Sequence, residues 1–262
     1  MGNKSRFVWH DLNTRDVHSA KRFYGELFNW SFEKSDNDPY HHIKTGAEMI
    51  GGIRQMEASE RMPSNWLGYV SVDDVQVTVA AAAAHGGKVY MPTTAMPNVG
   101  TFAVVADPTG GVVAPWRSAH PEQDQEPTGP TPIHAFCWDE LLTLDPTAAA
   151  KFYTAVFGWG AEAEDMGPMG TYTLFTRPGV KNRTQPDKSA WAGGMMQAPP
   201  KVPHSFWMAY VQVADSDATA ERAKKLGATV VVPPTDIPNI GRFCAFMDPE
   251  NAALAFISFP RS

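Results

Sequence analysis

The sequence predicts an α+β protein made of four modules, each consisting of a strand, a helix and three further strands (βαβββ). Two internal repeats predict this arrangement. The segment Arg22–Trp30 returns as Lys151–Trp159 with the same order of Phe-Tyr, apolar and Trp positions. A second segment that starts at Trp66 returns at Trp207. A chain of 262 residues is also long for a single core, so the repeats divide it into two similar halves.

The Phe-Tyr repeat predicts an amphipathic helix in each half. Apolar residues recur at positions i, i+3, i+4, i+7 and i+8, which places them on one broad face of a helix. Asp16 and Asp145 are the predicted N-caps, and Asn29 and Gly158 tolerate the left-handed conformation that ends a helix. The two apolar faces consist of Ala20, Phe23, Tyr24, Leu27 and Phe28, and of Ala149, Phe152, Tyr153, Val156 and Phe157.

Runs with strand character lie around both helices in the same order. Each half therefore opens with one strand and one helix, and three strands follow. The candidate strands are Phe7–Leu12, Ser31–Lys34, Tyr40–Thr45 and Met49–Met56 in the first half, and Phe136–Leu141, Gly160–Glu164, Thr171–Thr176 and Ala192–Gln197 in the second.

The second repeat predicts another module in each half. A strand opens it at Trp66 or Trp207, a helix capped by Asp74 or Asp215 follows, and three strands complete it. The last two strands are joined by turns of sequence Asp-Pro-Thr-Gly and Asp-Pro-Glu-Asn, in which Pro fixes one corner.

Composition sets the domain boundaries and limits the partners. Residues 118–132 are rich in Pro and in acidic or amide residues and predict a linker, so the domains are 1–117 and 133–262. A net charge of −6 argues against nucleic acid as a partner. The start of the chain has no signal-peptide pattern, and no stretch reaches the roughly 18 apolar residues of a membrane span. We therefore expect a cytoplasmic protein with neither a membrane nor a nucleic-acid partner.

Four βαβββ modules, Phe-Tyr in the first helix of each half, and an Asp-Pro turn before the last strand together resemble the vicinal oxygen chelate (VOC) superfamily. Glyoxalase I, bleomycin-resistance proteins and extradiol dioxygenases belong to it. The organisation is most similar to two-domain glyoxalase-like proteins, some of them labelled hydroxylases or culture-filtrate antigens. The resemblance implies that each half is one VOC domain, in which paired modules form a cupped mixed sheet with the helices outside.

In members of the superfamily that use a metal, His and Glu side chains from the cup hold one divalent ion. The resemblance places none of these ligands here, so we predict no metal and no other cofactor, with a divalent ion as the alternative. The equivalent positions hold Trp9 and Trp138, Leu67 and Met208, Ala114 and Ala255, and Gly51-Gly52 and Gly193-Gly194.

One half could still hold a degenerate metal site. The candidates are His10 with Asp11, and the neighbours His41 and His42. Adjacent residues of a regular strand point to opposite faces, so neither pair can share an ion there. A catalytic ion also needs about three protein ligands. These histidines therefore predict no metal centre.

The candidate site is instead the repeated pattern Trp-x-acid-Leu. Period-two geometry places Trp9 and Asp11 on one strand face, and Trp138 and Glu140 on its copy. An indole and a carboxylate suit a small planar or cationic ligand. The competing interpretation is packing, in which the Trp fills the space of an ion and the acid accepts backbone hydrogen bonds. By the resemblance the same cups are lined by Tyr69 and Tyr210.

Two function classes follow. The first is a metal-independent protein that binds and sequesters a small, partly aromatic or cationic molecule, as bleomycin-resistance proteins do. The second is a VOC enzyme of lyase, isomerase, hydroxylase or dioxygenase type. It would use Asp11 and Glu140 as general acid or base, or a degenerate metal site. The repeat is compatible with a monomer that has an internal pseudo-two-fold axis and with a homodimer.

Overall fold

The computed structural model describes residues 5–34, 40–121, 129–167, 170–179 and 190–260. Part of the predicted linker, 122–128, lies outside these ranges. The helices are α1 (Val17–Phe28), α2 (Val75–Ala84), α3 (Pro146–Phe157) and α4 (Ser216–Lys225). The strands of the first half are β1 (Phe7–Thr14), β2 (Ser31–Lys34), β3 (His41–Thr45), β4 (Glu48–Gln55), β5 (Asn65–Ser71), β6 (Lys88–Met96), β7 (Gly100–Ala106) and β8 (Val112–Ser118). Those of the second half are β9 (Phe136–Thr143), β10 (Gly160–Asp165), β11 (Thr171–Thr176), β12 (Trp191–Gln197), β13 (Phe206–Gln212), β14 (Thr229–Ile237), β15 (Gly241–Met247) and β16 (Ala253–Ser258).

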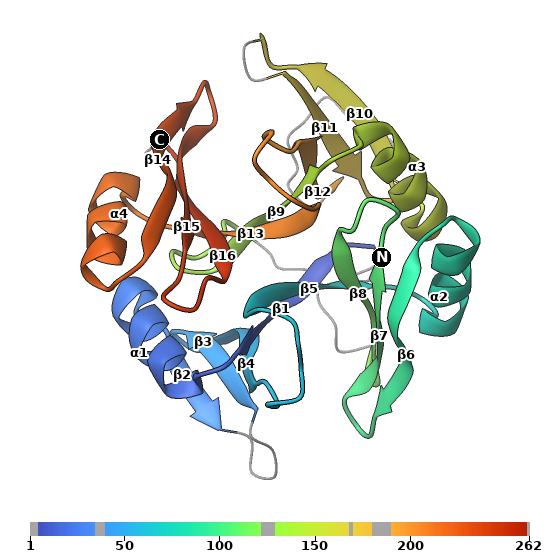
Figure 1. The fold of residues 1–262 in the computed structure, drawn as a ribbon, viewed down its shortest axis with the longest axis horizontal. Helices are drawn as coiled ribbons and strands as arrows, with labels where there is room; N and C mark the ends of the chain where they lie inside the picture. Colours follow the sequence, from blue (N-terminus) through green and yellow to red (C-terminus); the bar gives the residue numbers. More distant parts are fainter. Residues whose placement is uncertain (1–4, 35–39, 122–128, 168–169, 180–189, 261–262) are drawn as a thin grey trace. The chain divides into compact units, whose positions relative to one another are not determined.

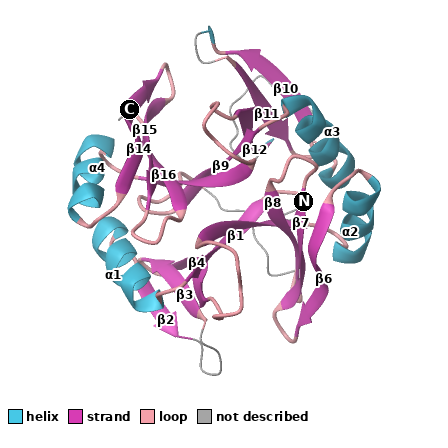
Figure 2. Ribbon diagram, in the orientation of Figure 1, coloured by secondary structure: helices cyan, strands magenta, loops and turns pink. Residues whose placement is uncertain are grey.

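The element order is βαβββ four times, so the predicted α+β fold is confirmed (Figure 2). Each half contributes one eight-stranded mixed sheet. The order is β2-β3-β4-β1-β5-β8-β7-β6 in the first half and β10-β11-β12-β9-β13-β16-β15-β14 in the second. Within each module the first strand pairs in parallel with the last, as β1 does with β4 and β5 with β8. Among the described helices, none is long and apolar enough to cross a membrane.

The helix ends follow the predicted capping chemistry. The Asp16 carboxylate accepts a hydrogen bond from the Ser19 backbone N–H at 2.9 Å, and Asp145 caps α3 in the same way. Asn29 ends α1 with φ of 56°, and Gly158 ends α3 with φ of 69°. Both residues occupy the left-handed region that the sequence predicted for them.

The left-handed end of α1 gives a stability prediction. Replacing Asn29 with Gly should leave the free energy of unfolding unchanged or raise it by up to about 1 kcal/mol, because Gly adopts positive φ without strain. Replacing it with Val should lower that free energy by about 1–2 kcal/mol, because a β-branched residue is strained there. Urea denaturation at pH 7 measures both, and equal stabilities of the Gly and Val variants would contradict the assignment.

The chain divides into two compact units, and neither is a sequence half. Unit 1 contains 1–8, 68–128 and 139–207, and unit 2 contains 9–67, 129–138 and 208–262. In unit 1, α2 from the first half lies beside α3 from the second, and in unit 2, α1 lies beside α4 (Figure 1). The division into 1–117, linker 118–132 and 133–262 describes the repeat and stays a prediction.

A Trp–Tyr–Asp hydrogen-bond chain joins the two modules of each unit, which come from different halves. In unit 2, the Trp66 indole donates to the Tyr24 hydroxyl at 3.0 Å, and Tyr24 donates to Asp248 Oδ2 at 2.9 Å. In unit 1, Trp207 donates to Tyr153 at 2.7 Å, and Tyr153 donates to Asp107 Oδ2 at 2.9 Å. The Asp of each Asp-Pro turn thus accepts from a helix of the other half.

The two tyrosines were predicted to lie on the apolar helix faces, and both are completely buried. Burial raises the pKa of each phenol well above 10, and the neighbouring Asp carboxylate raises it further. Both hydroxyls therefore stay protonated and act as donors to the carboxylates. They connect the core to the Asp-Pro turns and do not titrate in the physiological range.

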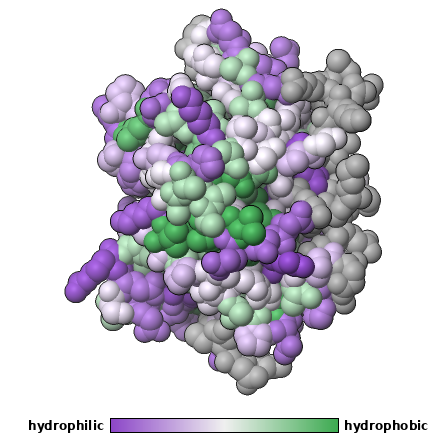
Figure 3. Space-filling view, turned by 90° about the vertical axis from the view of Figure 1, so that its right-hand side faces the viewer, coloured by the Kyte–Doolittle hydropathy of each residue, from purple (hydrophilic) through white to green (hydrophobic). Residues whose placement is uncertain are grey.

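Helix α2 is apolar on its outer face. Val77 is 65% exposed, and Ala80, Ala83 and Ala84 are also exposed. Apolar side chains gather over this helix in Figure 3. The equivalent α4 exposes charged side chains instead, including the Glu221–Lys224 ion pair. Packing of α2 therefore depends on its buried residues and not on an amphipathic pattern.

Candidate functional site

Trp9, Asp11 and Tyr40 form a closed hydrogen-bonded triangle in unit 2. The Trp9 indole N–H lies 2.9 Å from Asp11 Oδ1 and 2.8 Å from the Tyr40 hydroxyl. Tyr40 donates to the same Asp11 oxygen at 2.6 Å. Trp9 and Asp11 are two residues apart on β1, so their side chains share one face of the strand, and Tyr40 directly precedes β3. The triangle therefore brings the predicted Trp and acid together with a tyrosine that the sequence had not indicated.

A glycine makes room for the tyrosine. Gly52 of β4 is the pairing partner of Asp11, and a Cβ at this position would lie 1.8 Å from the Tyr40 hydroxyl and 2.6 Å from Asp11 Oδ1. Any larger residue would overlap with both groups. His42 presents its ring edge-on to Trp9 and to Tyr40, with centroid distances of 6.1 and 5.2 Å. Three side chains, those of Trp9, Tyr40 and His42, thus lie around the Asp11 carboxylate.

The second half repeats the acid, the glycine and the tyrosine in unit 1. Gly194 of β12 pairs with Glu140 of β9, and a Cβ on Gly194 would lie 1.9 Å from the Tyr172 hydroxyl. Trp138 is half-buried in β9, and Glu140 is 8% exposed. Tyr40 corresponds to Tyr172 and Gly52 to Gly194. This repetition in the two halves is the feature of the sequence that could have indicated the two tyrosines.

The Asp11 carboxylate is nearly buried and hydrogen-bonded. Its side chain is 8% exposed, and one of its oxygens accepts hydrogen bonds from both an indole N–H and a phenol O–H. These two donors replace water that burial removes from the carboxylate. On the other face of β1, Leu12 is buried in the core with α1. The Asp11 face is therefore the one that the helix leaves uncovered.

A polar network continues along the same face. Arg54 donates to both oxygens of Glu60 at 2.8 Å and to Asn13 Oδ1 at 2.9 Å. Asn13 in turn donates to Asn65 Oδ1 at 3.2 Å. Arg15 donates to the carbonyl oxygens of Glu57, Glu60 and Met62. These bonds hold the connection between β4 and β5 against the end of β1.

The Glu60 carboxylate gives this network a pH dependence. The hydrogen bonds from Arg54 lower its pKa from 4.5 to about 2. A lowered pKa stabilises the folded state above pH 4.5, and this contribution is lost as the pH falls from 4.5 toward 2. Because both side chains are partly solvated, Glu60→Gln should lower the free energy of unfolding by only about 1–2 kcal/mol at pH 7.

Urea unfolding at a series of pH values measures this effect. The difference between wild type and Glu60→Gln should shrink steadily below pH 4.5 and vanish near pH 2. Glu33→Gln is the matched control, because Glu33 is 57% exposed in its pair with Lys44 and should contribute under about 0.5 kcal/mol. A difference that persists at pH 2 would show that Glu60 acts through packing.

Comparison with known proteins identifies the family. The sequence model of the "Glyoxalase/Bleomycin resistance protein/Dioxygenase superfamily" matches residues 6–114 and 134–256. The chain belongs to this superfamily. The resemblance to VOC proteins that the sequence suggested is therefore confirmed, once in each half.

Relatives by sequence extend over nearly the whole chain. A Mycobacterium tuberculosis protein named "Putative glyoxylase CFP32" is 33% identical over 262 residues, covering 95% of this chain and 93% of the relative. The "Anthracycline biosynthesis protein DauV" of Streptomyces sp. is 26% identical over 271 residues, covering 95% and 92%.

Solved structures of VOC proteins share the fold. A Mn(II)-bound glyoxalase from Novosphingobium aromaticivorans has a TM-score of 0.64 at 14% identity, covering 98% of this chain and 83% of the other. The 2,3-dioxygenase LapB from Pseudomonas sp. KL28 has a TM-score of 0.63 at 12% identity, covering 99% and 95%. At these identities the similarity concerns the fold alone.

The VOC fold implies a divalent metal in some members, but the residues here do not fit one. The resemblance assigns the first ligand position to Trp9, and its indole nitrogen is a hydrogen-bond donor. Within the described ranges, no three His, Cys, Asp or Glu side chains are close enough to hold an ion. His10 is 4% exposed and its ring stacks on Phe136 with a centroid distance of 4.1 Å, so it is a core residue.

The two other predicted ligand-binding residues lie against aromatic neighbours. Tyr69 of β5 is in unit 1, with ring centroids 6.0 Å from Phe102 and 6.2 Å from Trp116. Tyr210 of β13 is in unit 2, only 4% exposed, and lies 6.2 Å from Phe243. Their role in ligand binding stays a prediction.

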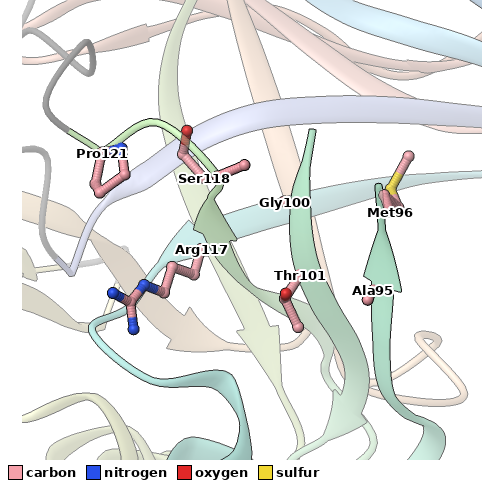
Figure 4. A pocket seen from close by; sticks show the side chains of 8 residues that line it. Ala95, Met96, Gly100, Thr101, Arg117, Ser118 and Pro121 are labelled. Atoms are coloured by element: carbon pink, nitrogen blue, oxygen red, sulfur yellow. The ribbon is translucent and has the colours of Figure 1, made fainter. Parts of the chain in front are cut away.

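An open hollow of about 400 Å³ lies elsewhere in unit 1, at the ends of β6, β7 and β8 (Figure 4). Met96, Thr101, Arg117 and Ser118 contribute to its lining. Arg117 is the charged member, and its guanidinium donates to the Asp73 carbonyl at 2.8 Å. The hollow holds no acid or base that could act on a ligand, so the hydrogen-bonded triangle is the better candidate site.

Proposed function

We propose that the chain is a metal-independent small-molecule-binding protein in which Trp9, Asp11, Tyr40 and His42 contact a planar or cationic ligand. The observation that carries this proposal is the hydrogen-bonded triangle. By the resemblance, it includes Trp9, the residue at the first ligand position of metal-using relatives. An indole N–H and a phenol O–H converge there on an anion, so the site presents negative charge in an aromatic setting.

The chemistry of these groups defines the ligand class. Trp9 and Tyr40 are half-buried, so part of each ring faces outward. The faces of such rings attract a cation or stack on a flat molecule. Asp11 adds a charge-assisted hydrogen bond to an ammonium or similar donor. Two relatives are named for anthracycline biosynthesis, and anthracyclines are flat aromatic molecules, which agrees with this class.

The second candidate is an enzyme of the superfamily. The name "glyoxylase" of the CFP32 relative favours it, and the nearly buried carboxylates of Asp11 and Glu140 would act as general base or acid. Sequestration predicts that a bound molecule is released unchanged. Recovery of the ligand after prolonged incubation, analysed by mass spectrometry, separates the two functions.

Binding is tested with daunorubicin, a planar molecule that carries an ammonium group, and with its uncharged aglycone. Asp11→Asn should weaken daunorubicin binding by about 1–3 kcal/mol and leave the aglycone nearly unchanged, because only the amine pairs with the carboxylate. Trp9→Phe should remove the ligand-dependent change in Trp fluorescence. Fluorescence and calorimetric titrations measure both effects.

Glu33→Gln serves as the charge-matched control and should bind both compounds as wild type does. Elemental analysis of the purified protein should give no stoichiometric metal, and a chelator should leave binding unaltered. If Asp11→Asn lost the same affinity for daunorubicin and for the aglycone, the electrostatic role of Asp11 would be wrong. Near one equivalent of metal per chain, lost on replacing His10 or Asp11, would instead favour the enzyme.

A further inference from the structure

We infer that the chain carries two binding faces of different polarity, and that the second takes an organic cation with an apolar body. The first face consists of Trp9, Asp11, Asn13, Tyr40, His42, Gly52, Arg54 and Asn65 in unit 2. The second face consists of Glu140, Leu142, Tyr172, Leu174, Gly194, Met196 and Phe206 in unit 1. This inference rests on the proposed function and extends it to the second half.

Strand register makes the two faces directly comparable. Asp11 pairs with Gly52 and His42 pairs with Gly52, as Glu140 and Leu174 both pair with Gly194. Tyr172 of β11 also lies over its glycine as Tyr40 does. The acid, the tyrosine and the glycine are therefore common to both faces.

The surrounding positions differ systematically. Asn13 pairs with Arg54 on the first face, and Leu142 pairs with Met196 at the equivalent place on the second. His42 is replaced by Leu174 in the same register. At the start of the following strand, Asn65 of β5 corresponds to Phe206 of β13. Four polar or charged positions of the first face are thus apolar on the second.

The apolar side chains of the second face do not pack against helix α3. Leu141, Phe175 and Met195 point to the other side of the same three strands and form the core with α3. Leu174, Met196 and Phe206 are half-buried, so each keeps part of its surface open. Glu140 lies among them with 8% exposure. A carboxylate in the same strand rows as partly exposed apolar side chains is complementary to a cation that carries hydrocarbon.

The first face would disfavour such a ligand. Arg54 is bonded to Asn13 and Glu60, and Asn13 is bonded to Asn65. An apolar body placed over these groups would remove water from them without replacing its hydrogen bonds, which is unfavourable. On the second face the same body would cover apolar surface, which is favourable. We therefore expect the two faces to select between cationic ligands by the polarity of the ligand body, polar for the first face and apolar for the second.

Two pyridinium probes test this inference on the full chain. 1-Hexylpyridinium carries an alkyl chain, and 1-methylnicotinamide carries a hydrogen-bonding amide on the same charged ring. Glu140→Gln should weaken hexylpyridinium binding about tenfold or more, because the charge pair is lost, and should leave methylnicotinamide unchanged. Asp11→Asn should have the reverse effect. Calorimetry gives the affinities, and the Met196 methyl resonance should shift with hexylpyridinium alone.

Two further variants exchange the polarity of the equivalent positions Leu174 and His42. Leu174→Asn should weaken hexylpyridinium binding to the second face, and His42→Leu should strengthen its binding to the first face. The inference is overturned if both probes respond equally to Glu140→Gln and Asp11→Asn, or if methylnicotinamide binds through Asp11 while hexylpyridinium binds nowhere. If neither probe binds, and daunorubicin is also insensitive to Asp11→Asn, the proposed function fails together with it. Thermal unfolding of each variant confirms that the fold is retained.

Discussion

Replacing Asp107 with Ala is expected to lower the free energy of unfolding by about 3–5 kcal/mol, because it leaves several buried donors without an acceptor. Asp107 is 3% exposed. One of its oxygens accepts from Tyr153 at 2.9 Å. The other accepts from the Thr109 N–H at 2.6 Å, the Thr109 hydroxyl at 2.7 Å and the Gly111 N–H at 3.2 Å.

Urea unfolding at pH 7 measures this loss, and the repeat supplies an internal comparison. Asp248 accepts from Tyr24, from the Glu250 N–H and from the Ala252 N–H, so Asp248→Ala should have an effect of similar size. Tyr153→Phe removes one hydroxyl but keeps the bonds of Thr109 and Gly111 to Asp107, so it should lower the free energy of unfolding by only about 1–3 kcal/mol. If Asp107→Ala cost no more than Tyr153→Phe, the turn bonds would not be the main contribution.

Gly52→Val is expected to reduce ligand affinity by about 2–4 kcal/mol, the range of a residue central to a binding site. The Cβ alone would lie 1.8 Å from the Tyr40 hydroxyl and 2.6 Å from Asp11 Oδ1. Tyr40 must move away, and its bonds to Asp11 and to Trp9 are lost. The free energy of unfolding should fall by about 1–3 kcal/mol from overpacking, so the variant should stay folded.

Calorimetric titration with daunorubicin measures the change in affinity. Gly194→Val is the matched control, because its Cβ would displace Tyr172 of unit 1 and leave the first face intact. Daunorubicin binding through Asp11 should persist in that control. Wild-type affinity in Gly52→Val would mean that the triangle is a packing feature and that the ligand binds elsewhere.

The sequence alone determined most of the local structure. Helix ends at Asp16, Asn29, Asp145 and Gly158 follow from side-chain capping and from tolerance of positive φ, which depend on a few neighbouring residues. Alternation along β1 was also sufficient to place Trp9 and Asp11 on one face. These features are determined within one helix or one strand, so no knowledge of the rest of the fold was needed.

Tyr40 could not be placed by the same reasoning. Its contact with Asp11 depends on which residues of β3, β4 and β1 lie opposite one another, and a shift of one residue would turn the side chain to the other face. The sequence contains the pairs Tyr40/Tyr172 and Gly52/Gly194, but their meaning emerges only from the register Asp11–Gly52 and Glu140–Gly194.

Only the tertiary structure decided which modules share a core. The repeat suggests pairing within each half, and each half does form one sheet. The compact units nevertheless combine a first module with the second module of the other half. Each unit has a hydrophobic core built from both modules, and within it Tyr24 bonds to Asp248 or Tyr153 to Asp107, residues far apart in the chain. A buried hydroxyl and a buried carboxylate each require a partner, and the partner is set by packing in three dimensions and not by distance along the sequence.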